Sequence, residues 1–248
     1  MGALHSDPLV PSASRTGIDV LPLTSERVPG RRYCLITPCR DEATYASRTI
    51  ESVARQTLPP ALWVVMDDGS KDGTASIVER YAATLPYLRL LRRSDRGRRK
   101  VGPGVIEAFN AGYASINPED FDYICKLDLD LELPPGYFEA LVQRMEAEPR
   151  LGTTSGKPWF VHPRSGSLEP EVCGDEMSVG MTKFYRRSCF VEIGGFVEQV
   201  MWDGIDCHRA RMLGWLAESV DNEALPCSYP GRRPITAMEV WVSQSPSP

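Results

Sequence analysis

The sequence predicts an α/β fold in which a mostly parallel sheet carries helices on both faces. Short apolar segments alternate along the chain with segments whose apolar residues recur at helical spacing. The composition, 42% hydrophobic and 25% charged, is that of an ordinary globular protein. The length of 248 residues suits one large domain or two fused halves. Strands and helices that alternate in this way build parallel sheets.

The first half of the chain shows the alternation most clearly. Four short apolar segments are expected to form strands: 34–37, 62–66, 87–91 and 123–127. Three segments between them carry apolar residues on one helical face: 46–54, 77–85 and 105–116. The first strand is expected to stop at Pro38, and the second to end at Asp67.

The second half is less regular. A helix is expected over 137–145, after a pair of prolines, and a strand over 182–186. Another helix is expected over 206–213, closed by Gly214.

The two ends of the chain differ from its middle. Residues 1–30 and 226–248 are rich in proline and serine and show no sustained hydrophobic period. They are expected to form a loosely ordered N-terminal arm and an irregular C-terminal tail. The middle is expected to consist of one half over 31–130 and a second half over 131–225.

Composition and cysteine usage exclude several function classes. The net charge of −5 argues against general nucleic-acid binding. No apolar run approaches the ~20 residues that span a bilayer, and residues 1–10 lack the features of a secretory signal. The seven cysteines are scattered and form no CxxC pair, which favours buried thiols in a reducing compartment. We therefore expect a cytoplasmic protein without a transmembrane segment, and leave peripheral contact with a membrane open.

Chemistry is expected where the strands end, because ligands of such sheets lie beyond the carboxyl ends of the strands. Polar segments follow three of the predicted strands: Thr37-Pro38-Cys39-Arg40-Asp41-Glu42, Asp67-Asp68-Gly69-Ser70-Lys71-Asp72-Gly73-Thr74 and Asp128-Leu129-Asp130.

The strongest local signal is the pair Asp128 and Asp130. Two carboxylates two residues apart at a strand end can face one hard cation together. Mg²⁺ or Mn²⁺ is usually held by one or two carboxylates and by phosphate oxygens of a substrate. The alternative is a solvated acidic turn, and the spacing alone does not decide between the two.

The other polar segments also have two interpretations each. The carboxylates of 67–74 could accept hydrogen bonds from a base or a ribose, or they could form a turn and a helix cap, which we favour for Asp72. Asp203 and Asp206 precede the last predicted helix, and Asp206 is expected to cap it. A basic run could face a phosphate or be a solvated surface. It consists of Arg89, Arg92, Arg93, Arg96, Arg98, Arg99 and Lys100.

Taken together, these segments resemble the family 2 glycosyltransferases of the GT-A fold. The resemblance covers about residues 33–215, most of the chain. It rests on seven segments in order: TPCRDE, VMDDGSKDGT, GVIEAFNAGY, KLDLDLELPPGYFE, GMTKFYRR, IGGF and WDGIDCHRARMLGW.

The resemblance implies a GT-A, Rossmann-like α/β domain and an inverting, metal-dependent hexosyltransferase. Such an enzyme transfers a sugar from a nucleoside-diphosphate sugar to a saccharide or lipid-linked acceptor in polysaccharide or glycan biosynthesis. A UDP-sugar is the first expectation for the donor, and GDP-mannose is its competitor. The 31–130 half would bind the nucleotide sugar, and the 131–225 half would bind the acceptor.

The resemblance also implies roles for individual residues. Asp128 and Asp130 would hold the ribose and an Mg²⁺ or Mn²⁺ that bridges the diphosphate. Asp203, favoured over Asp206, would deprotonate the acceptor hydroxyl. Contacts with the donor would come from Thr37, Pro38, Arg40, Glu42, Asp68, Arg99, Lys100 and Asp128.

Other function classes fit less well. The GxGxxG turn of a Rossmann dehydrogenase is absent after the first strand, and so is the GxSxG of a serine hydrolase. The Gly-rich, Arg-containing first loop of a sugar nucleotidyltransferase is also missing. After Trp215 the chain has no histidine, whereas family members often place one on the metal. The serious alternative is therefore a catalytically silent nucleotide-sugar-binding or assembly protein of the same fold.

Overall fold

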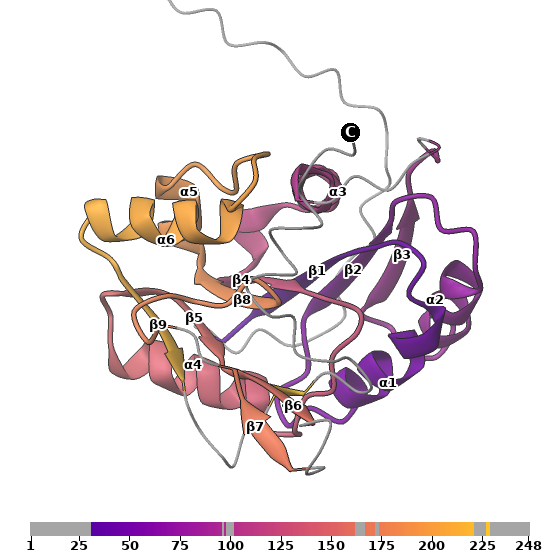
Figure 1. Cartoon of the computed structure of the whole chain (residues 1–248), viewed down its shortest axis with the longest axis horizontal. Helices are drawn as coiled ribbons and strands as arrows, with labels where there is room; N and C mark the ends of the chain where they lie inside the picture. The colour runs from indigo at the N-terminus through magenta and orange to yellow at the C-terminus, as the bar shows by residue number, and fades with distance from the viewer. Residues whose placement is uncertain are drawn as a thin grey trace, which may run out of the picture.

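The computed structural model describes residues 31–95, 97, 102–161, 167–171, 174–220 and 227–228. Within these residues, the main feature is a seven-stranded sheet in the order β3-β2-β1-β4-β8-β5-β9 (Figure 1). Its strands are β1 Tyr33–Cys39, β2 Leu62–Asp67, β3 Leu88–Arg92, β4 Tyr123–Leu127, β5 Leu151–Gly156, β8 Thr182–Arg186 and β9 Leu216–Val220.

The sheet is mostly parallel, as predicted. Strands β3, β2, β1 and β4 run parallel to one another, and β5 runs parallel to β9. Strand β8 is antiparallel to its neighbours β4 and β5. Every residue of β1, β2 and β4 is buried, which is the pattern of strands that are covered on both faces.

Helices cover the two faces of the sheet (Figure 1). One hydrophobic cluster packs α1, α2 and α4 on the sheet, and a second packs α3, α5 and α6 on the opposite face. The helices are α1 Ala43–Ala54, α2 Thr74–Ala82, α3 Pro103–Tyr113, α4 Tyr137–Ala147, α5 Arg187–Glu192 and α6 Trp202–Met212. A 3-10 helix spans Pro118–Asp120.

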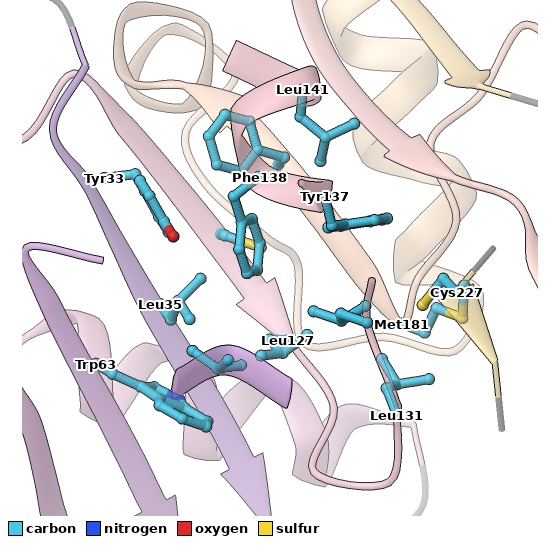
Figure 2. Packing of buried hydrophobic residues seen from close by; sticks show 14 of the residues in the cluster. Tyr33, Leu35, Trp63, Leu127, Leu131, Tyr137, Phe138, Leu141, Met181 and Cys227 are labelled. Atoms are coloured by element: carbon cyan, nitrogen blue, oxygen red, sulfur yellow. The ribbon is translucent and has the colours of Figure 1, made fainter. Parts of the chain in front are cut away.

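A smaller sheet lies beside the first cluster, in the order β10-β6-β7. It consists of β6 Pro158–Val161, β7 Leu168–Pro170 and β10 Cys227–Ser228. Figure 2 shows Cys227 on the side of the cluster where Leu131 and Met181 lie. Residues 227 and 228 thus form a short strand within the segment predicted as an irregular tail. The N-terminal arm over 1–30 and the rest of that tail lie outside the described residues.

The prediction that the first strand stops at Pro38 is wrong, because β1 continues to Cys39 in register with β2. In a parallel strand, the N–H and C=O of one residue point to the same side. The Cys39 carbonyl accepts from the Asp68 amide on the β2 side, so Pro38 points to the β4 side. Pairing with β4 ends at Ile36, so the missing amide of Pro38 removes no ladder hydrogen bond.

The cysteines match the prediction of buried thiols. Those in the described residues are buried and free: Cys34, Cys39, Cys125, Cys189, Cys207 and Cys227. Burial raises the pKa of Cys189 to about 12, which keeps this thiol protonated at neutral pH. In the described part of the chain, no helix is long and apolar enough to cross a membrane.

The Tyr137 hydroxyl joins α4 to two strands of the sheet, and its removal should be destabilising. This buried hydroxyl contacts Thr182 Oγ1 at 2.7 Å and accepts from the Gly156 amide at 2.8 Å. Tyr137→Phe keeps the ring but leaves the buried amide without its acceptor, so we expect a loss of about 1–3 kcal/mol in the free energy of unfolding. Urea denaturation measures it, with Tyr87→Phe on a half-buried ring as the control. Equal, small effects for the two variants would contradict this account.

Candidate active site

The three predicted polar segments lie at the carboxyl ends of β1, β2 and β4, and these strands are neighbours that run in the same direction. Their carboxyl ends therefore share one edge of the sheet. The Arg40 guanidinium, just after β1, donates to the Asp68 carbonyl, just after β2, at 2.8 Å. This hydrogen bond brings the first two polar segments into contact.

Around Arg40, a network of charged side chains lines the ends of β1 and β2. Arg40 is 8% exposed, and its Nη2 also donates to Asp95 Oδ1 at 2.8 Å. Arg93 Nη1 donates to the buried carboxylate of Asp68 at 3.0 Å. The Arg93 guanidinium thus places a positive charge beside the Asp68 carboxylate.

Asp95 has an unusually low pKa. The Gly97 amide and the cations of Lys71 and Arg40 lower the pKa of Asp95 to about 2. Because this value lies below the ordinary pKa of about 4, the carboxylate's contribution to stability is complete above pH 4 or so. That contribution is lost as the pH falls from about 4 towards 2.

Replacing Lys71 should change the pKa of Asp95. Lys71 Nζ lies 3.2 Å from Asp95 Oδ2, so Lys71→Met is expected to raise the pKa of Asp95 towards its ordinary value. NMR titration of the Asp95 carboxyl carbon measures the change. Lys71→Arg keeps the charge and should keep the low pKa. An unchanged pKa in Lys71→Met would contradict the role given to this cation.

The remaining predicted residues of the first two polar segments are less accessible or serve the fold. Thr37 is fully buried, and its Oγ1 accepts from Trp63 Nε1 at 2.9 Å. Pro38 is buried in β1, and the Glu42 amide, next to α1, donates to Thr74 Oγ1. Asp72 accepts from the amides of Ala43 and Thr74, the first residues of α1 and α2. Asp72 therefore serves the fold at these two helix starts, although Gly73, and not Asp72, is the N-cap residue of α2.

The carboxylate pair lies at the end of β4. Asp128 is about one-third exposed, at 33%, and its Oδ1 contacts the ammonium of Lys126, a residue of β4 itself. Asp130 is 3% exposed and sits in a turn that Thr49 of α1 holds. Thr49 Oγ1 donates to the Leu129 carbonyl at 2.8 Å and accepts from the Leu131 amide at 3.0 Å.

These two carboxylates fit a cation that a substrate also coordinates. Among the residues that the structure describes, no group of three His, Cys, Asp or Glu side chains gathers as a metal site. Mg²⁺ and Mn²⁺ accept one or two carboxylates when phosphate oxygens and water complete the shell. Asp128 and Asp130 supply hard oxygen donors of this kind at the carboxyl end of a central strand.

Asp203 lies in the first turn of α6, against the chain that enters β8. A Cβ on Gly180 would lie 2.9 Å from Asp203 Oδ2, so only glycine lets the carboxylate approach this closely. The Gly180 carbonyl in turn accepts from Lys126 Nζ at 2.7 Å. Gly180 thus stands between Asp203 and the lysine that contacts Asp128.

The prediction that Asp206 caps this helix is wrong. Helix α6 begins at Trp202, so Asp206 lies beyond its first turn, and its side chain is 1% exposed. The carboxylate accepts from Lys183 Nζ at 2.6 and 2.7 Å and from the Tyr185 hydroxyl at 2.5 Å. Burial raises the pKa of Asp206, and Lys183 opposes this effect. These contacts tie α6 to β8 and leave Asp203 as the more exposed carboxylate of the two.

Three residues in the floor of this site were not predicted. The ammonium groups of Lys126 and Lys183 lie 5.3 and 5.6 Å from the centre of the Trp202 ring. The available signal was a lysine inside each of two predicted strands, YICKL and TKFYR. A buried cation needs a partner, so each lysine indicated a nearby carboxylate. The predicted diphosphate contacts Arg99 and Lys100 lie outside the described residues.

Comparison with known proteins adds independent findings. A family model described as Glycosyl transferase family 2 matches residues 34–170. The succinoglycan biosynthesis protein ExoA of Rhizobium meliloti (strain 1021) is 28% identical over 123 residues, which make up 49% of this chain and 34% of that protein. The chain therefore spans about a third of this relative's length.

Solved structures show the same fold. The mannosyltransferase PcManGT from Pyrobaculum calidifontis, in complex with GDP-Man and Mn²⁺, is similar with a TM-score of 0.60 and 21% identity, over 85% of this chain and 59% of that chain. S. aureus TarS 1-349, in complex with UDP-GlcNAc, gives a TM-score of 0.63 and 17% identity, over 87% and 62%. These similarities confirm the predicted fold class.

Proposed function

The chain belongs to glycosyl transferase family 2, and from this premise we propose that it is an inverting enzyme that uses a nucleoside-diphosphate sugar. Its acceptor is a saccharide or a lipid-linked saccharide in polysaccharide biosynthesis. One observation carries the proposal: Lys126 contacts both Asp128 and Gly180, while Asp203 lies against the same Gly180. Asp128, which is proposed to act on the donor, and Asp203, which is proposed to act on the acceptor, thus lie on either side of Gly180.

The nucleotide is assigned to the ends of β1 and β2. Asp68, held by Arg93, is the proposed acceptor of hydrogen bonds from the base. We propose a UDP-sugar as the donor. GDP-mannose is the alternative donor, and the thermal-shift screen described below compares the two nucleotides. Two of the similar structures are complexes with GDP-Man and with UDP-GlcNAc, which supports this choice of nucleotides to test.

Asp203 is the proposed general base. Inversion in one displacement needs a carboxylate on the side of the anomeric carbon opposite the leaving group. The Asp203 carboxylate would take the proton of the acceptor hydroxyl as the hydroxyl oxygen bonds to the anomeric carbon. The bond from that carbon to the diphosphate oxygen breaks in the same step, and the nucleoside diphosphate leaves.

Asp128 and Asp130 are the proposed ligands of a divalent cation. When bound, such a cation stabilises the negative charge that develops on the departing diphosphate. We expect Asp130→Ala to abolish the gain in donor affinity that Mn²⁺ gives, and Asp128→Ala to reduce it. Calorimetric titration of the donor with and without Mn²⁺ measures both. Equal donor affinity with and without Mn²⁺, together with full activity in excess EDTA, would contradict the assignment of Asp128 and Asp130 as metal ligands.

A thermal-shift screen of nucleoside diphosphates with Mg²⁺ or Mn²⁺ tests the proposed function. A ligand that binds only the folded state stabilises it by about 2.7 kcal/mol at a hundredfold excess over its dissociation constant. We expect UDP to raise the unfolding temperature in the presence of the metal and ADP to have little effect. No shift with UDP or GDP would contradict nucleotide-sugar binding.

A further inference from the structure

Lys126 is a buried cation in an otherwise apolar strand. Its side chain is 3% exposed, and the four other residues of β4, Tyr123, Ile124, Cys125 and Leu127, are buried apolar residues. Burying an ammonium group is costly unless opposite charge and hydrogen-bond acceptors surround it. The position of Lys126 therefore depends on the groups around its Nζ atom.

Three groups compensate this charge. The Asp128 carboxylate contacts Nζ, the Gly180 carbonyl accepts from it at 2.7 Å, and the Trp202 ring centre lies 5.3 Å away. Asp128 supplies the full negative charge among them. Asp128 follows Lys126 by two residues and comes directly after the end of β4 at Leu127.

We propose that Lys126 is a built-in counter-ion of Asp128 that keeps the affinity of the Asp128–Asp130 pair for a divalent cation low until a nucleoside diphosphate is bound. This inference rests on the proposed function, which gives that pair its role. A unit positive charge beside one ligand repels an incoming divalent cation. It also leaves a net charge of about −1 on the two carboxylates and the lysine together.

A bound diphosphate changes this balance. It adds at least two negative charges and further oxygen ligands, so the cation is attracted once the nucleotide is present. Cation and nucleotide then bind cooperatively, and each raises the affinity for the other by the same factor. Removing the lysine charge should therefore raise the affinity for the cation alone and reduce this cooperativity.

The test is a titration of the nucleotide-free protein with Mn²⁺, in which electron paramagnetic resonance measures the free ion. For the wild type we expect a dissociation constant above about 100 μM, since two carboxylates beside a cation attract the ion only weakly. Binding in the low micromolar range without nucleotide would overturn the proposal without any variant.

Variants give the second part of the test. Lys126→Met removes the charge, and Lys126→Gln removes it but keeps an amide donor for Gly180. Both are expected to bind Mn²⁺ at least about tenfold more tightly than the wild type. Lys126→Arg keeps the charge and should stay within about twofold of the wild type. Arg144→Met is the matched control, because it removes the positive charge of an ion pair with Glu218 between α4 and β9.

The outcomes separate the two proposals. Unchanged Mn²⁺ affinity in a neutral variant that folds, judged by near-ultraviolet circular dichroism, would overturn the counter-ion role. If UDP and GDP fail to stabilise the wild type while Mn²⁺ binding still tightens in Lys126→Gln, the proposed function is wrong and the charge coupling stands.

Discussion

Replacing Asp203 with asparagine is expected to lower the rate of sugar transfer by about 100-fold or more, which is the usual scale for losing a general base. Asparagine has the shape of aspartate but cannot take a proton. Asp203 is the half-exposed carboxylate at the start of α6 and lies against Gly180. Donor affinity should stay near the wild-type value, because the substitution leaves Asp68, Asp128 and Asp130 unchanged.

Steady-state kinetics and donor titration together test this expectation. Asp120→Asn, in the 3-10 helix before β4, is the matched control and should keep normal transfer. Normal turnover by Asp203→Asn, with a folded but inactive Asp206→Asn, would reverse the roles of the two carboxylates. A parallel loss of donor affinity in Asp203→Asn would show that this residue binds the donor.

Breaking the buried pair of Lys183 and Asp206 is expected to cost about 3–5 kcal/mol in the free energy of unfolding. The two side chains are 0% and 1% exposed, and Lys183 Nζ also donates to the Asp203 carbonyl at 2.5 Å. Among the residues that the structure describes, Lys183→Met leaves the buried Asp206 carboxylate with the Tyr185 hydroxyl and the Cys207 amide as its hydrogen-bond donors. The loss arises mainly from this uncompensated charge.

The double variant Lys183→Met/Asp206→Leu separates charge from packing. It removes both charges, so we expect it to be more stable than Lys183→Met alone, although Tyr185 loses its acceptor. Urea denaturation of the wild type, the two single variants and the double variant measures the coupling. If the losses in unfolding free energy of the two single variants add up in the double variant, the two charges do not compensate each other, and the effect arises from packing.

The sequence predicted best those elements whose residues are buried on both sides. Strands β4 and β8 begin and end where predicted, because each is rich in aromatic and β-branched residues. Strand β5, with the sequence LGTTSG, was not predicted, since two glycines and three hydroxyl side chains give no apolar pattern. Its burial arises from α4, which precedes it directly, and from β8 and β9, which are distant in sequence, so its position depends on tertiary contacts.

Some residues of the candidate site could be identified from the sequence, whereas others depend on tertiary contacts. Carboxylates after strands are visible in the sequence, so Asp68, Asp128 and Asp130 could be identified as candidates. The start of α6 could not be identified, because Met201 enters the helix at a positive φ of 61° and the helix has a weak apolar pattern. That shift by one turn made Asp206 look like a cap, whereas it is the buried partner of Lys183. Such pairs depend on which strand lies against which helix.

The most direct test of the central claim is release of nucleoside diphosphate from a panel of nucleoside-diphosphate sugars, measured with Mn²⁺ and with excess EDTA. We expect the protein to turn over donors of one nucleotide class, UDP-sugars first. We also expect EDTA to suppress the release and Asp203→Asn to reduce it almost to zero. Donor binding by the folded protein without any release, even with saccharide acceptors present, would contradict the account and would identify a nucleotide-sugar-binding protein of the same fold.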